Sequence, residues 1–307
     1  MKLHIYPTDK DWFDFLATSP GIDEVNFWRP GGQSAFTRLD PGDLFLFRLK
    51  GRVNRIAGGG VFTHFSIFPL NAAWEAFGIK NGTSDFKHFA STIAGYKNFS
   101  PPESMPLDSP IGCIILSSPF FFAPADWIPV PPDYPLNNPQ GGTYDASSEV
   151  GRDLFDQVLL RLRARPIVQE RDPARVIGDP VLVRRRIGQG AFRILVTDLY
   201  GRRCAVTGER TLPVLEAAHI LPISRGGVHS PDNGLLLRSD IHTLFDLGYV
   251  TISDRGKFRV SETLRSEWQN GRVYYDLGEK EVRFPDAFEH RPNKMWLQRH
   301  NDEVFRG

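Results

Sequence analysis

The stretch 215–246 restricts the fold more than any other part of the chain. An apolar run ends there at His219, and Asn233 follows in the turn-like sequence SPDNG. Farther on, His242 and Asp246 are four residues apart. Residues with this spacing share one face of a helix, so the two side chains should converge. We therefore predict strands, a loop and a helix in β-β-α order, with two strands around 204–220, a loop to about 238 and the helix from Asp240 on.

The residue types in this stretch suit the hydrolysis of a phosphodiester. A phosphodiester repels nucleophiles, so a metal cation is needed to neutralise the charge that develops on its oxygens. A general base must also take a proton from water, and histidine titrates near neutral pH. The base must in turn be held in one orientation and tautomer. His242 and Asp246 can converge on one ion, and this ligand pair suits Mg²⁺ or Mn²⁺, with Ni²⁺ or Zn²⁺ as alternatives.

The segment EAAHILPISRGGVHSPDNGLLLRSDIHTLFDLG resembles the HNH endonucleases, which have the ββα-metal fold. It is most similar to the restriction-like branch with the signature AAHI.P…NG..L…H.LFD, and the similarity extends over about residues 175–305. The resemblance implies that His219 is the general base and that Asn233 orients it through its backbone or side chain. It also implies that His242 binds the metal and that Asp246 is a second helix ligand.

The sequence departs from this family at Ala218, where many members have an Asp or His that binds the metal. Glu216 is the candidate replacement, because residues two apart on a strand point to the same face. Each role has an alternative. Glu216 could pair with an arginine or a backbone amide instead, and Asp246 could be a hydrogen-bonding residue of the helix face. His219 could be a structural histidine.

Several neighbouring residues receive lesser roles. We expect His229 to be a surface or substrate-facing histidine and Asp240 to cap the helix. Cys204 precedes Thr207 rather than a second cysteine, so a structural zinc is not expected. Arg225 is a candidate for substrate binding through a phosphate, and a solvated surface position is the alternative.

The distribution of charge supports a nucleic-acid partner. The net charge of +1 hides a division, because residues 1–150 hold 11 basic and 15 acidic residues whereas 151–307 hold 26 and 21. Arginines dominate the basic excess and include a run at 184–186. Arginine suits bidentate contact with phosphate, although a solvated basic surface would have the same composition.

The composition also indicates a compartment. The two cysteines are far apart in the sequence, so no disulfide framework is expected. We find no apolar run of about 18 residues and no secretory signal pattern at the N-terminus. We therefore expect a cytoplasmic protein with no membrane partner.

The organisation of the chain indicates two domains of α+β class. Proline- and glycine-rich zones at 98–110 and 124–144 place the main boundary near residue 145. Before it, alternating apolar stretches at 42–50, 54–68 and 112–122 predict strands of a small barrel, and 71–78 predicts a helix. We expect three segments: a reader domain at 1–130, a linker with a helix at 131–174, and the HNH domain at 175–307.

The N-terminal half resembles the PUA-like domains, the superfamily of EVE, YTH and SRA modules. The similar residues are NFWRPGG (26–32), LDPGDLFLFRLK (39–50) and IAGGGVF (56–62). The resemblance implies a pocket that captures a flipped, modified base, and such a base needs aromatic walls to replace its lost stacking. Phe27 and Trp28 are the candidate substrate-binding residues, and packing in the barrel core is their alternative role.

Together these patterns predict a modification-dependent, restriction-like DNA endonuclease that acts on double-stranded DNA. The modification stays open among methylcytosine, hydroxymethylcytosine, glucosylated cytosine and phosphorothioate. One HNH site cuts one strand, so a double-strand break would require a homodimer or two successive nicks. One alternative, favoured by Ala218, is a reader of modified bases with an inactive HNH domain. Another is a nickase or RNA nuclease that ignores modification.

Overall fold

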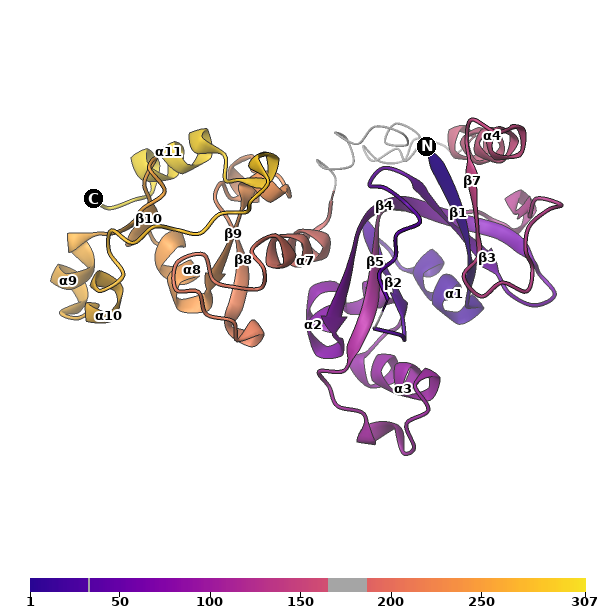
Figure 1. Ribbon diagram of the computed structural model, residues 1–307, viewed down its shortest axis with the longest axis horizontal. Coiled ribbons are helices and arrows are strands. Elements are labelled where there is room, and N and C mark those ends of the chain that lie inside the picture. The colour runs from indigo at the N-terminus through magenta and orange to yellow at the C-terminus, as the bar shows by residue number, and fades with distance from the viewer. Residues whose placement is uncertain (33, 165–186) are drawn as a thin grey trace. The chain divides into compact units, whose positions relative to one another are not determined.

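A computed structural model describes residues 1–32, 34–164 and 187–307. The chain divides into two compact units, Met1–Ala191 and Phe192–Gly307 (Figure 1). The arginine run at 184–186 lies outside the described residues.

The first unit is built on one mixed sheet. Its strands pair in the order β2 (Glu24–Arg29), β5 (Pro110–Phe121), β4 (Arg55–Pro69), β3 (Leu44–Leu49), β1 (Lys2–Thr8) and β7 (Gly142–Asp145), and β6 (Ile128–Pro129) pairs with β4. The β1–β3 pair is parallel, and the other pairs are antiparallel. The three strands predicted at 42–50, 54–68 and 112–122 are thereby confirmed.

The expected closed barrel is not found. Within the described residues the pairing path has two ends, β2 and β7, and the sheet is therefore open. Pro30 follows β2 and has no backbone N–H to donate to another strand. At the other end of the sheet, β7 spans only Gly142–Asp145 before a helix begins. The register of β4 against β5 shifts twice, which bends the sheet without closing it. The PUA-like relationship of this unit stays a prediction.

Both faces of the sheet are covered, as β3 shows. All of its residues are buried, and alternate side chains enter different clusters. Leu44 and Leu46 join a mainly aliphatic cluster, called the aliphatic cluster below, whereas Phe45 and Phe47 join one rich in aromatic rings, called the aromatic cluster. The aromatic cluster also contains Trp12 of α1 (Lys10–Thr18), so this helix packs against the aromatic face.

Further helices complete the first unit. These are α2 (Leu70–Phe77), which confirms the helix predicted at 71–78, α3 (Phe86–Tyr96) and α4 (Glu149–Arg163). The segment expected to be a linker, 131–174, contributes structure to this unit. Its strand β7 pairs with β1, and Leu154, Val158 and Leu162 of α4 are buried in the aliphatic cluster. Burial of these three side chains ties α4 to the sheet of the first unit.

The second unit contains the expected β-β-α arrangement. Strands β8 (Leu215–His219) and β9 (Gly234–Arg238) pair antiparallel, and α8 (Ser239–Asp246) follows β9 directly. The second strand lies after the loop rather than around 204–214, which forms turns and a short 3-10 helix. The other elements are α7 (Gln189–Leu199), which begins in the first unit, β10 (Val250–Ile252), β11 (Phe258–Val260), α9 (Glu262–Trp268), α10 (Arg272–Tyr275) and α11 (Lys294–Glu303).

Across the part of the chain that the structure describes, every helix is too short or too polar to span a bilayer.

Candidate active site

His219 is the last residue of β8, and its ring is held on one face and at one edge. The face stacks on Phe192 of α7, with ring centroids 4.0 Å apart and an interplanar angle of 8°. At the edge, Nε2 of His219 lies 3.0 Å from Nδ1 of His229. A β-carbon on Gly234, the strand partner of His219, would collide with Val196 of α7, so glycine lets α7 pack closely here.

The environment of His219 keeps its imidazole neutral. Burial, together with the nearby His229 and His242, lowers the pKa of His219 to about 4. At neutral pH the ring therefore has an unprotonated nitrogen that can accept a proton from water.

This shift predicts an unusual dependence of cleavage on pH. Only neutral His219 can accept a proton, and a pKa of about 4 preserves that form as the pH falls through 6.5. Single-turnover cleavage at saturating metal should therefore change little between pH 8 and about pH 5.5, and should fall only as the pH nears 4. Circular dichroism at each pH checks that the fold persists. A loss of rate centred near pH 6.5 in folded protein would contradict the prediction.

Asn233 braces the loop that follows His219. Its side chain is fully buried, accepts a hydrogen bond from the backbone N–H of Leu221 (2.8 Å), and donates to the carbonyls of Leu221 and Val228 (both 2.9 Å). Its own carbonyl accepts from the N–H of Ile220 (3.0 Å). These bonds hold backbone on both sides of the loop, so any influence of Asn233 on His219 passes through that loop.

The ring of His242 lies between two carboxylates. Oε2 of Glu216 is 2.6 Å from Nδ1, and Oδ2 of Asp246 is 3.4 Å from Nε2. The sequence analysis brought these three residues together correctly, but the carboxylates approach opposite nitrogens of the ring. Within the described residues no group of three His, Cys, Asp or Glu side chains is arranged to hold an ion. Ala218 is fully buried and supplies no ligand.

One cavity of about 470 Å³ brings the candidate residues together. It is lined by His219, His242, Asp246 and Arg225, among others. Burial raises the pKa of the Asp246 carboxyl, which a neighbouring cation would counteract. An imidazole and a carboxylate on this wall fit a divalent cation that takes its other ligands from water and phosphate. Arg225 adds a guanidinium to the same cavity, where a phosphate contact was expected.

Comparison with known proteins identifies this segment. Residues 204–253 match the family model of the HNH endonucleases. This part of the chain is an HNH nuclease domain. It contains His219, Asn233, His242 and Asp246, and HNH nucleases generally use a divalent metal ion. The comparison leaves the metal of this HNH domain and the role of each residue as predictions.

Two further comparisons concern the chain beyond the HNH segment. The search of curated proteins finds no match. Among solved structures, the chain is similar to a protein described as "Modification dependent TagI restriction endonuclease", with 24% identity and a TM-score of 0.26. The match covers 37% of this chain and 37% of that one, so the chain spans well under half of that protein.

The sequence analysis missed His229 and Phe192 as neighbours of His219. His229 was expected at a surface or facing substrate, and the structure places it against His219, the candidate base. Its distance from His219 depends on how the intervening loop folds, which the spacing of residues does not reveal. Phe192 reaches the site from α7, outside the matched segment.

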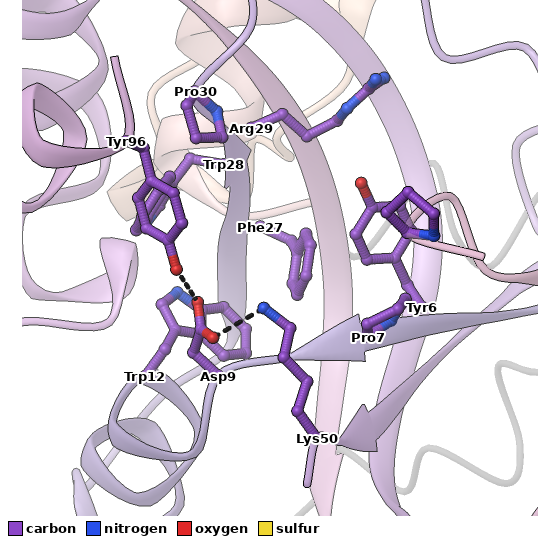
Figure 2. Close-up of a pocket in the computed structure, with 11 residues that line it drawn as sticks. Tyr6, Pro7, Asp9, Trp12, Phe27, Trp28, Arg29, Pro30, Lys50 and Tyr96 are labelled. Carbon is purple, nitrogen blue, oxygen red and sulfur yellow. Dashed lines mark hydrogen bonds and ion pairs between the residues drawn. The ribbon is translucent and has the colours of Figure 1, made fainter. Parts of the chain in front are cut away.

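The two aromatic candidates of the first unit line a separate cavity of about 210 Å³ (Figure 2). Phe27 and Trp28 share its wall with Asp9, Lys50 and Tyr96, among others. One carboxylate oxygen of Asp9 accepts from Lys50 Nζ and the other from the Tyr96 hydroxyl, both at 2.7 Å. Phe27 is largely buried, and the indole N–H of Trp28 donates to the Asn81 carbonyl (2.9 Å).

Proposed function

We propose that the chain is a modification-dependent DNA endonuclease. His219 takes a proton from the attacking water, Arg225 contacts the phosphate, and His242 with Asp246 holds a divalent cation. When bound, the cation stabilises the charge that develops on the phosphate and the leaving oxygen. The observation that carries the proposal is the position of His219, kept neutral by burial, in one cavity with the His242–Asp246 pair.

The aromatic cavity of the first unit supports a role in reading a base. Pockets for drug-sized ligands measure about 300–1,000 Å³, so a cavity of about 210 Å³ suits a single ring system. Phe27 makes T-shaped contacts with Tyr6 and Trp12, which line the same cavity, both at 5.1 Å between centroids. Such rigid aromatic walls can replace the stacking that a base loses on leaving the duplex. At the polar edge of such a base, Asp9 offers hydrogen-bond acceptors and Lys50 offers a donor.

A second cavity that carries arginine side chains adjoins the aromatic cavity at Arg29 and favours a nucleic acid over a free planar molecule. Arg29 lines both the aromatic cavity and a second, polar cavity that contains Arg38 and Lys2, whose Nζ pairs with Asp40 at 2.8 Å. Burial, with Arg38 nearby, lowers the pKa of His4 to about 4, so at neutral pH the positive charge here comes from lysine and arginine. A strand could therefore place a base between the aromatic rings and its phosphates along the cations.

Matched plasmids test the proposed function. We expect cleavage in Mg²⁺ or Mn²⁺ of a plasmid that carries one of four modifications, and none of the unmodified plasmid. The modified set contains methylcytosine, hydroxymethylcytosine, glucosylated cytosine and phosphorothioate. Asp9→Ala should weaken binding of the cleaved DNA by about tenfold or more, since it removes a polar anchor of the pocket. Asp14→Ala is the matched control, because Asp14 is on α1, the helix that Asp9 immediately precedes, and pairs with Lys10 outside the cavity.

The other outcomes discriminate between the parts of the proposal. Equal cleavage of every plasmid would keep the nuclease and remove the reader. Binding of modified DNA without cleavage under any metal would favour a reader with an inactive HNH domain, for which the buried Ala218 is the supporting observation. If both strands are cut, sedimentation with and without DNA separates a homodimer from two successive nicks.

A further inference from the structure

We propose that His229 is a positioning residue for His219. It accepts a hydrogen bond from Nε2 of His219 and thereby directs the lone pair of Nδ1 toward the attacking water. The inference rests on the proposed nuclease function and adds a residue to which the sequence analysis gave no part in the reaction.

The packing around His219 leaves one ring nitrogen available for chemistry. Nε2 is 3.0 Å from Nδ1 of His229, and the ring face is covered by Phe192. His229 also packs against this pair, with its ring centroid 5.0 Å from that of His219 and 5.7 Å from that of Phe192. Since Nε2 is engaged by His229, Nδ1 is the nitrogen with which His219 can accept a proton.

The role of His219 as a base requires one direction for this hydrogen bond. A neutral imidazole has one N–H donor and one acceptor nitrogen. If Nδ1 of His219 is to accept a proton, its own hydrogen must be on Nε2, and Nδ1 of His229 must be the acceptor. When the proton of water bonds to Nδ1, Nε2 keeps its hydrogen, so the contact persists in the imidazolium and becomes charge-assisted. His229 therefore supports the base before and after proton transfer.

The loop that carries His229 is built to hold it in place. Asn233 donates to the carbonyl of Val228, the residue immediately before His229. A side chain at Gly227 would collide with the carbonyl of Leu221, so the loop closes tightly against the residues after β8. Asn233 thus acts on His219 indirectly, by fixing the position of His229. This explains how an asparagine that bonds only to loop backbone can orient the base.

A metal-binding role for His229 fits the structure less well. The cavity lined by His219, His242 and Asp246 does not include His229 among its described lining residues. His229 contacts Nε2 of His219, and in this proposal the attacking water lies at the other nitrogen, Nδ1.

Two substitutions separate positioning from packing. His229→Leu removes the acceptor, whereas His229→Asn keeps an amide oxygen near the place of Nδ1. We expect His229→Leu to lower the single-turnover cleavage rate by about 10- to 100-fold, the range found when a metal-bound histidine loses the partner that orients it. His229→Asn should recover most of the rate. DNA affinity and thermal midpoint should stay close to wild type in both. Equal rates for the two variants, or a wild-type rate for His229→Leu, would overturn the proposal.

A measurement independent of cleavage keeps this inference distinct from the proposed function. Histidine side-chain ¹⁵N NMR of the full chain, assigned with His219→Gln, reports which nitrogen carries hydrogen. We expect His219 to be the Nε2–H tautomer in wild type and His229→Asn, and a mixture of tautomers in His229→Leu. An Nδ1–H tautomer in wild type would refute the role of His229 even if the DNA is cut. Failure of the wild type to cut DNA, by contrast, would refute the nuclease and not the tautomer.

Discussion

Replacing His219 by alanine should lower the rate of phosphodiester cleavage by about 10²- to 10⁴-fold, the usual contribution of a general base. The cavity keeps Arg225, His242 and Asp246 in the variant, so binding of DNA and metal should persist. Single-turnover cleavage at saturating enzyme and metal measures the loss directly, since it removes substrate affinity and product release from the rate.

A control variant must separate the loss of the base from the loss of packing against Phe192. His219 stacks on Phe192, so alanine also leaves a gap beneath α7. His219→Gln fills more of that space but provides no titratable base, and it should lose as much activity as alanine with a smaller change in thermal midpoint. If His219→Gln cuts DNA at nearly the wild-type rate, His219 is a structural histidine and the assignment of the base is wrong.

Short-range spacing explains which parts of the site could be predicted from sequence. His242 and Asp246 are one helical turn apart, and Glu216 points from a neighbouring strand, so their meeting follows from regular backbone geometry. The approach of His229 to His219 could not be predicted, because it depends on a loop whose path is set by Asn233 and by close packing at Gly227. Loop conformation of this kind follows from tertiary contacts rather than periodicity.

The same limit applies to the first unit. The alternation of apolar residues predicted β3, β4 and β5, but not the parallel pairing of β1 with β3 or the open edges at β2 and β7. Those depend on contacts between residues far apart in the chain. The helix α4 shows the same effect. A helix within 131–174 was predicted from the sequence, whereas its partner, a sheet that begins at Lys2, was not.

Asp246→Asn and Glu216→Gln should have unequal effects on metal binding, with the larger loss for Asp246. Asp246 lies on the Nε2 side of His242 and lines the cavity, so it can share an ion with that nitrogen. Glu216 contacts Nδ1, the position of a carboxylate that orients a ligand histidine, and such partners contribute about 10- to 100-fold in metal affinity or activity.

Calorimetric titration with Mn²⁺, together with the metal dependence of the cleavage rate, tests this difference. His242→Ala is the reference for a lost ligand, because His242 contacts both carboxylates. Asp246→Asn should resemble that reference, whereas Glu216→Gln should still bind Mn²⁺ and reach a measurable rate when the metal concentration is raised. Equal losses in all three variants would instead make Glu216 a direct ligand. In that case Glu216 would have to leave Nδ1 of His242 and replace the ligand that Ala218 lacks.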